Sequence, residues 1–493
     1  MDQSQTKPPS APVQDVNATV DPNQPIETPV DIGIQIEGYE PPPGNDQYGQ
    51  PPPPPPSAGF NKRLIIVAVL IVVLLISLSV GIFLAVRPKK VVEQIVLTYW
   101  GLWEEEAVMQ TVINDYQSSH PNITIQYSMQ SPKEYRQRLQ AAISRGEGPD
   151  IFRFHNTWVP MIVKELAPIP EAAYPYEEFK KTFYPIASRD LTVNNQLVGI
   201  PIMIDGLVMY YNATLLDEAG VAIPSTWDEF EAAVQKMTVK NEAGEIVIAG
   251  AALGTTENIE HFSDIVGLML YQNSADPSNV KMPSLSGGEA IQALTYYALF
   301  AQPPNNVWDA KQGNSIVAFA GGKVAFIFAP SWEIFAVKAM SPDLVFGVAP
   351  VPQLTGANKV TWGTYWVEGV SSGSKYQAEA VEFITYLSSR DVMTKLFAES
   401  SKTRLFGNPY SRTDLADEMR KNNFLVPIVD SAPHMYSWYV SSRTQDEGIN
   451  DRIIAYFRNA LNAIYQGSSP EGELQTVSAG VTQVMSDYSL TPP

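Results

Sequence analysis

Apolar and polar positions near residue 100 follow the pattern of a strand–helix repeat. Ile95–Trp100 (IVLTYW) is a short apolar run typical of a buried strand, and Asn122–Tyr127 (NITIQY) alternates as a second strand does. Between them, residues 104–119 place apolar side chains on one helical face, and Pro121 ends that helix. The positions that define this face are Ala107, Val108, Val112, Ile113 and Tyr116.

The same pattern continues with a second helix and a third strand. Ser131-Pro132 has the sequence of a helix start, an N-cap followed by proline at the first helical position. Asp150–Phe154 (DIFRF) is typical of the third strand. One helical face continues as far as Gly146 through Tyr135, Leu139 and Ile143.

A β-α-β-α-β order predicts a parallel sheet with right-handed crossovers. In open α/β sheets, ligands bind beyond the carboxyl ends of the strands. This rule points to Trp100–Glu105 after the first strand and to Arg153–Trp158 after the third.

Later segments predict further elements. Leu191–Val193 and Leu197–Ile202 flank Asn194-Asn195, residues that tolerate turn geometry, so a hairpin is expected. Thr226–Glu229 (TWDE) forms a capping box, which places the start of a helix there. The other expected elements are strands at Lys323–Phe328 and Leu344–Val348 and helices at Ala378–Leu387 and Arg452–Ile464.

Residues 64–86 (LIIVAVLIVVLLISLSVGIFLAV) are uncharged and strongly apolar. At roughly 1.5 Å per residue, a helix of this length spans a hydrocarbon core of about 30 Å. The apolar run is longer than the core of a cleaved signal peptide, and no convincing cleavage site follows Val86. A retained single-pass anchor over residues 62–88 is therefore expected, with a buried core helix as the alternative. The flanking charges are nearly balanced and leave the orientation open.

Composition narrows the functions that the rest of the chain can have. Residues 1–61 are rich in proline, including the run Pro51–Pro56, and acidic, which predicts a disordered tail. A formal charge of −19 argues against nucleic-acid binding, because phosphate needs a basic face. The chain has no cysteine, which excludes disulfides, thiolate chemistry and a lipid attached to cysteine.

The remaining part, residues 91–493, has a two-domain length and carries an ordered set of motifs. With its motifs in this order, this part of the chain resembles the extracellular solute-binding proteins of ABC importers, in the group related to maltodextrin-binding proteins. The motifs that carry the resemblance are His120–Thr124 (HPNIT), Gly146–Ile151 (GEGPDI), Leu197–Pro201 (LVGIP), Tyr211-Asn212, Pro224–Phe230 (PSTWDEF), Phe319–Ala325 (FAGGKVA) and Ala329–Trp332 (APSW).

The resemblance implies an α/β, two-lobed periplasmic-binding-protein (type II) fold, with a hinge and a cleft between the lobes. The first lobe would hold residues 93–200 and 340–400, and the second would hold residues 205–335 and 405–490. The resemblance also implies which side chains contact the solute: Trp103, Glu104, Arg153, His155, Asn156, Asp205, Glu257, His261, Trp332, Trp362, Tyr365 and Trp438.

Each of these positions also has a structural interpretation. A tryptophan is more often part of a core than a stacking platform, and this applies above all to Trp362 and its neighbours. Asp205 lies in an apolar stretch, and a buried carboxylate needs a partner, for which Arg153 is one candidate. The first-turn glutamates, Glu104 among them, could simply be favoured by a helix dipole.

The expected function is capture of a small polar solute, a sugar first, by closure of the two lobes, followed by delivery to an ABC permease. The binding domain would be monomeric and outside the cell membrane, and the tail cytoplasmic. Two alternatives remain: a ligand sensor with the same fold and a carbohydrate-active enzyme. No catalytic or metal-binding motif is complete, and the four histidines are scattered, so no enzyme activity, metal or cofactor is expected.

Overall fold

The computed structural model describes residues 61–85, 93–274, 284–285 and 287–490. The chain divides into two compact units, Met1–Lys89 and Lys90–Pro493. The proline-rich tail, residues 1–60, lies outside the described residues, so the expectation of disorder there stays a prediction.

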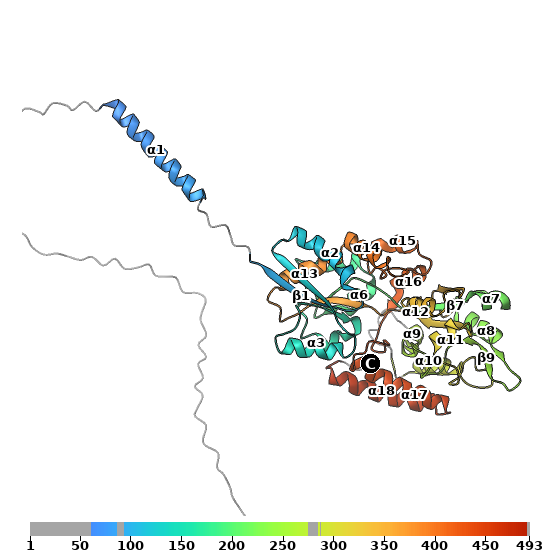
Figure 1. Ribbon diagram of the computed structural model, residues 1–493. Helices are drawn as coiled ribbons and strands as arrows, with labels where there is room; N and C mark the ends of the chain where they lie inside the picture. The colour runs from blue at the N-terminus through green and yellow to red at the C-terminus, as the bar shows by residue number, and fades with distance from the viewer. Residues whose placement is uncertain (1–60, 86–92, 275–283, 286, 491–493) are drawn as a thin grey trace, which may run out of the picture. The chain divides into compact units, whose positions relative to one another are not determined.

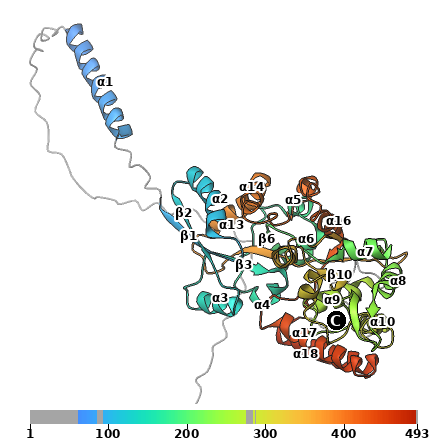
Figure 2. The ribbon, with the colours of Figure 1, turned by 45° about the vertical axis from the view of Figure 1, so that its right-hand side comes forward.

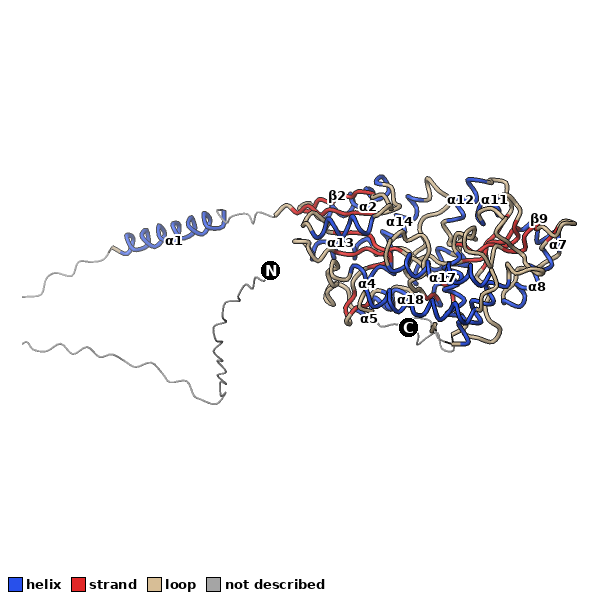
Figure 3. Tube along the Cα trace, turned by 90° about the horizontal axis from the view of Figure 1, so that it is seen from below, coloured by secondary structure: helices blue, strands red, loops and turns tan. Residues whose placement is uncertain are grey.

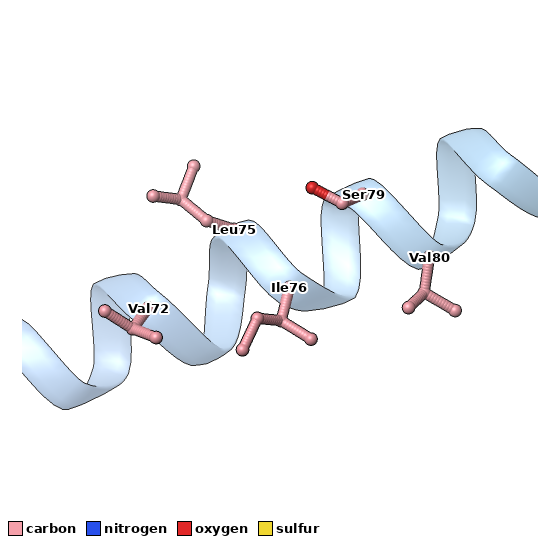
Figure 4. Close-up of a pocket in the computed structure, with 5 residues that line it drawn as sticks. All are labelled: Val72, Leu75, Ile76, Ser79 and Val80. Carbon is pink, nitrogen blue, oxygen red and sulfur yellow. The ribbon is translucent and has the colours of Figure 1, made fainter. Parts of the chain in front are cut away.

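The hydrophobic segment forms one helix, α1 (Lys62–Ala85). From Lys62 to Val80, every side chain is exposed within its unit. This stretch is long and apolar enough to cross a bilayer by length and composition. Figure 4 shows five of its side chains, Val72, Leu75, Ile76, Ser79 and Val80. No side chain of this stretch is buried by the described residues of its unit, which favours the anchor over the alternative of a buried core helix.

The second unit contains two five-stranded sheets, and Figure 3 shows their strands as two separate groups. In the first sheet, β1 pairs in parallel with both β2 and β3, as the strand–helix repeat predicts, while β13 joins antiparallel to β3. The strand order is β2 (Ile123–Met129), β1 (Ile95–Gly101), β3 (Ile151–His155), β13 (Trp366–Val370) and β6 (Ile200–Pro201). Its longer helices are α2 (Glu106–Ser119), α3 (Tyr135–Ser144), α13 (Gln377–Leu387) and α14 (Arg390–Ser400).

The expected start of the second helix at Ser131-Pro132 is wrong, because α3 begins at Tyr135. The amide of Lys133 donates to the Ser131 hydroxyl, and the amide of Tyr135 to the Pro132 carbonyl, so these residues form a turn. Glu134 then takes a left-handed φ of 53°, which no helix continues through. The local cap signal was real, but it serves a turn.

The second sheet places β10 at its centre, where all six residues are buried. The predicted capping box at Thr226 and Glu229 is confirmed and opens α8, whose apolar face packs on this sheet. The strand order is β11 (Phe346–Ala349), β7 (Val208–Asn212), β10 (Val324–Ala329), β9 (Ile246–Ala251) and β8 (Val239–Lys240). Its helices are α7 (Ala213–Ala219), α8 (Trp227–Met237), α9 (Phe262–Gln272), α10 (Gly288–Leu299), α11 (Ser315–Ala320) and α12 (Glu333–Met340).

Two long helices at the end of the chain, α17 (Ile449–Tyr465) and α18 (Pro470–Asp487), run side by side and contact α10 (Figures 1 and 2). The predicted hairpin is present, with Asn194 and Asn195 at φ of 48° and 62°. The remaining elements are η1 (Asn156–Trp158), α4 (Val159–Ile162), α5 (Tyr176–Thr182), α6 (Pro185–Asp190), β4 (Thr192–Val193), β5 (Gln196–Leu197), β12 (Thr361–Trp362), η3 (Thr413–Leu415), α15 (Ala416–Met419), α16 (Val426–Ser431), η4 (Ala432–His434) and β14 (Met435–Tyr436).

The chain returns to the first sheet later than the expected residue 340. β11 pairs with β7 in the second sheet, where Phe346 stacks on Tyr210 and packs against Phe319. Residues 405–411, expected in the second lobe, instead bond to the first: Ser411 Oγ donates to the Pro201 carbonyl and Asn408 Nδ2 to Glu104. Strand pairing and ring packing set the first of these lobe boundaries, and hydrogen bonds between residues far apart in the sequence set the second.

Three segments pass between the sheets and are hydrogen-bonded side by side. The first is residues 202–207, the second contains β12, and the third contains β14. The amide of Leu207 donates to the Trp362 carbonyl at 3.1 Å, and the amide of Thr364 donates to the Asp205 carbonyl at 2.9 Å. β12 pairs in parallel with β14, and the amide of Gly363 donates to the Tyr436 carbonyl at 2.8 Å. We call these three segments the hinge.

Gly206 is the point of closest approach in the hinge. A Cβ atom built there would overlap the Trp362 carbonyl oxygen and approach Met435 Cε to 2.8 Å. Because the overlapping atom belongs to the backbone, no rotamer change can make room.

We expect Gly206→Ala to destabilise the globular unit by at least about 2 kcal/mol, because the hinge segments must move apart. Gly288→Ala is the matched control, since a Cβ there meets no atom within 4 Å. Thermal unfolding of both variants checks this. Equal melting temperatures for Gly206→Ala and the wild type would contradict the close approach.

Candidate ligand-binding site

The loop after β1 presents Trp103 in a strained turn. Trp103 has a φ of 73°, and the amide of Glu104 donates to the Leu102 carbonyl at 2.9 Å, which together define a classic γ-turn. A bulky residue in this conformation costs on the order of 1–3 kcal/mol, and such strain is concentrated at ligand-binding and catalytic sites. The indole is 45% exposed and meets Trp366 edge to face, with ring centroids 5.7 Å apart.

The residues beside Trp103 are fixed by a buried ion triad. Arg153, fully buried on β3, pairs with Glu104, and its Nη2 lies 2.6 Å from Glu368 Oε1 on β13. Its Nη1 also donates to the Leu102 carbonyl at 2.7 Å. Burial alone would lower the pKa of Arg153, but Glu368 raises it above its usual value, so the guanidinium stays charged.

These contacts change two of the sequence expectations. Arg153 is not the partner of Asp205, because its guanidinium is occupied by Glu104 and Glu368. Glu104 lies just before α2, which begins at Glu106, and its carboxylate binds Arg153 and Asn408. It is therefore not a solvent-exposed first-turn carboxylate.

The loop after β3 ties the first lobe to the hinge. His155 is buried, and its Nε2 lies 2.9 Å from Thr364 Oγ1 in the second crossing. Burial lowers the pKa of His155 to about 3, so the ring is neutral. Asn156 Nδ2 donates to Asp190 Oδ2 at 2.8 Å and to Ser437 Oγ at 2.9 Å.

Asp205 fixes the turn that carries Trp332. Its Oδ2 accepts from Ser331 Oγ at 2.6 Å, and its Oδ1 accepts from the amides of Ser331 and Gly206. Burial raises the pKa of Asp205 to about 6, although these hydrogen bonds oppose the shift. The carboxylate thus links the first crossing to the turn after β10, and Trp332 follows half-buried on that turn.

A buried charged cluster lies next to Trp332. His261 lies between Asp264 Oδ2 at 3.3 Å and Glu333 Oε1 at 3.4 Å, with its ring centroid 6.1 Å from that of Trp332. Asp264 also accepts from Trp362 Nε1 at 2.8 Å and from the hydroxyl of Ser442. Burial alone would lower the pKa of His261, but the hydrogen bonds to Asp264 and Glu333 raise it to about 9. The imidazole is therefore a cation at neutral pH.

Three of the expected contact residues lie in the packed interior. Trp362, Tyr365 and Trp438 are at most 2% exposed. The indole of Trp362 lies against Gly267 of α9, and the Tyr365 hydroxyl donates to Asp190 Oδ2 at 3.0 Å. Glu257 is exposed and accepts from Asn462 Nδ2 at 3.2 Å.

The structure adds a contact between the lobes that no sequence motif indicated. Phe335 on α12 lies 4.6 Å from Phe406, centroid to centroid, and the guanidinium of Arg404 lies over the same ring at 5.5 Å. Residues 404–411 belong with the first lobe, so these rings join the two lobes beside Glu104 and Asn408. The sequence did not indicate this contact, because the exposed Leu405 lies between Arg404 and Phe406 and the three residues form no helical or strand period.

Comparison with known proteins assigns the family. Residues 100–394 match the model of the bacterial extracellular solute-binding protein family. The chain belongs to this family. A Multiple sugar-binding protein of Streptococcus mutans is 24% identical over 353 residues, covering 69% of this solute-binding protein and 80% of the relative. A maltotriose-binding protein of Pyrococcus abyssi is 22% identical over 265 residues, covering 52% of this chain and 53% of the relative.

Solved structures confirm the two-lobed fold of this solute-binding protein. The sugar-binding protein MalE of Xanthomonas citri superposes with a TM-score of 0.65 at 18% identity, covering 80% of this chain and 98% of that one. A cyclic α-maltosyl-1,6-maltose binding protein of Arthrobacter globiformis gives a TM-score of 0.63 at 21% identity, with coverage of 80% and 99%. Among the residues that the structure describes, no group of three or more His, Asp or Glu side chains is arranged to hold a metal ion.

The raised pKa of His261 implies that the stability of the folded protein depends on pH. The charged ring stabilises the folded solute-binding protein fully below pH 6.5, its ordinary pKa, and this stabilisation is lost as the pH rises through about 9. We expect His261→Gln to lower stability by on the order of 3 kcal/mol near pH 6, with a much smaller loss at pH 10. Thermal unfolding of both proteins from pH 6 to pH 10 measures the difference. A constant difference across this range would contradict a cationic His261.

Proposed function

We propose that this chain is the membrane-anchored, sugar-binding component of an ABC importer. The observation that carries the proposal is the pair of accessible indoles on the two lobes. Trp103, 45% exposed, projects from the loop after β1, and the half-buried Trp332 lies on the turn after β10, next to His261 of the buried charged cluster. A sugar ring presents flat C–H faces that stack on aromatic rings, so two such platforms suit a saccharide.

The charges around the two platforms argue against an anionic ligand. Arg153 is paired with Glu104 and Glu368, and His261 with Asp264 and Glu333. Because each cation already has two carboxylate partners within the protein, an anionic ligand would find no free cation among them. The names of the relatives, which include a maltotriose-binding and a Multiple sugar-binding protein, point to the same ligand class.

Closure of the lobes would couple solute capture to transport. The lobes are joined by the hinge and also by the contact of Phe335 with Phe406 and Arg404, whose segment bonds to the hinge where the amide of Ile204 donates to the Pro409 carbonyl at 2.9 Å. A solute that touches both Trp103 and Trp332 favours the closed arrangement by its differential affinity alone. The partner that binds the closed form would be an ABC permease.

We expect the full chain in detergent to melt at a higher temperature with its sugar, because ligand that binds only the native state stabilises it. The panel contains mono- and oligosaccharides, including maltotriose. Trp103→Ala and Trp332→Ala should each remove most of the shift. Tyr465→Ala, which removes an exposed ring at the end of α17, should leave it unchanged. A panel without a single shift would contradict sugar binding.

Helix α1 would anchor the chain with the binding unit outside the cell and the tail inside. The chain has no native cysteine, so single introduced cysteines report topology cleanly. We expect Lys402→Cys, an exposed position of the binding unit, to react with a membrane-impermeant maleimide on intact cells. Ser4→Cys should react only after lysis. The opposite labelling pattern, or recovery of the full chain in the soluble fraction, would reject this anchor.

A further inference from the structure

The strained turn at Trp103 is held on both sides by hydrogen bonds and ion pairs of its two neighbours. On one side, Leu102 is fully buried and its carbonyl accepts from both Arg153 and the amide of Glu104. On the other side, the Glu104 carboxylate binds Arg153 and Asn408, and the Glu104 carbonyl accepts from the Tyr127 hydroxyl at 2.7 Å. Five contacts thus fix the two neighbours of one exposed indole.

The contacts come from distant parts of the chain. Arg153 lies on β3 and Asn408 follows α14, so the turn at Trp103 forms only when the first lobe is complete. Without them, a bulky residue would leave the left-handed region, because that conformation crowds its Cβ. The buried triad therefore does more than stabilise the core: it imposes the backbone conformation of Trp103.

We propose that Arg153, Glu104 and Asn408 are positioning residues that hold Trp103 as a rigid stacking platform for a ligand with a flat, non-ionic C–H face, such as a sugar ring. The ligand class in this proposal rests on the proposed function. The geometry of the turn does not depend on it. A platform fixed in advance loses no side-chain or loop entropy when the ligand binds, so it binds more tightly than a mobile loop with the same ring. The edge contact with Trp366 sets the plane in which the indole stands.

Arg153 and Glu104 then contribute to binding without touching the ligand. Arg153 is fully buried and Glu104 is 6% exposed, and both are engaged within the protein: Arg153 by Glu104, Glu368 and the Leu102 carbonyl, and Glu104 by Arg153 and Asn408. The resemblance implied that both contact the solute. Of the two residues Trp103 and Glu104, the geometry assigns the contact to Trp103, whose side chain is exposed.

The strain is tested by a matched pair of variants that both lack the ring. Glycine adopts a φ of 73° without a Cβ clash, whereas alanine does not. We expect Trp103→Gly to melt above Trp103→Ala in the full chain, although glycine is normally the less stabilising residue. The reverse order would overturn the γ-turn and the proposal with it.

The positioning role is tested by fluorine NMR of the full chain labelled with 5-fluorotryptophan, in detergent and without any sugar. The Trp103 resonance is assigned by its absence in Trp103→Phe. We expect Asn408→Ala and Glu104→Gln to shift or broaden this resonance, and Glu105→Gln, the same change at the exposed neighbour, to leave it in place. Trp308, buried in the second lobe, is the internal reference whose line should not move.

An unmoved Trp103 line in folded Asn408→Ala and Glu104→Gln would overturn the proposal, because the residues would then be structural only. Asn408→Ala removes one surface-proximal amide and keeps the test valid even if Glu104→Gln fails to fold. The melting comparison and the fluorine NMR both work without a ligand. A failure of sugar binding is therefore distinguishable from a failure of the positioning residues to hold Trp103. Where maltotriose raises the melting temperature of the wild type, Asn408→Ala should bind it several-fold more weakly while Glu105→Gln binds it normally.

Discussion

The close approach of Gly206 to the Trp362 carbonyl is the constraint on which the two-lobed unit depends. It allows three crossing segments to lie within hydrogen-bonding distance of one another, so the lobes are joined by a compact hinge and not by loose linkers. From this hinge, Asp205 reaches the turn before Trp332, and Trp362 donates to Asp264 in the cluster that holds His261. Trp332 and His261, which lie at the proposed binding site, are therefore attached through Ser331 and Asp264 to the hinge segments.

Each lobe has one buried ionic group next to an accessible tryptophan. In the first lobe, Arg153 with Glu104 and Glu368 supports Trp103; in the second, His261 with Asp264 and Glu333 lies beside Trp332. Breaking a buried pair by removing one partner costs about 3–5 kcal/mol, so each group is rigid under ordinary conditions. Rigid platforms on hinged lobes are what a binding protein needs, because closure then brings preformed surfaces together.

Much of the fold could be predicted from local patterns. The parallel β1–β3 unit follows from short apolar runs separated by helical faces, and the capping box at Thr226 marks α8 correctly. Ser131-Pro132 misled because the same residues that cap a helix also form turns. The state of Trp103 could not be read locally, since Glu104 bonds to residues 49 and 304 positions away. The interior place of Trp362 depends equally on Gly267, 95 positions earlier, where the missing side chain leaves room for the indole.

The central claim is that the two lobes move about the hinge and close on a sugar. The chain lacks cysteine, so spin labels at Gln110→Cys on α2 and Glu218→Cys on α7 report the distance between the lobes. Pulsed electron–electron double resonance on the full chain measures this distance most directly. It is recorded with and without a sugar that raises the melting temperature of the protein. The account predicts a shift to a shorter, narrower distribution with sugar. One distribution, identical in both conditions, would contradict it.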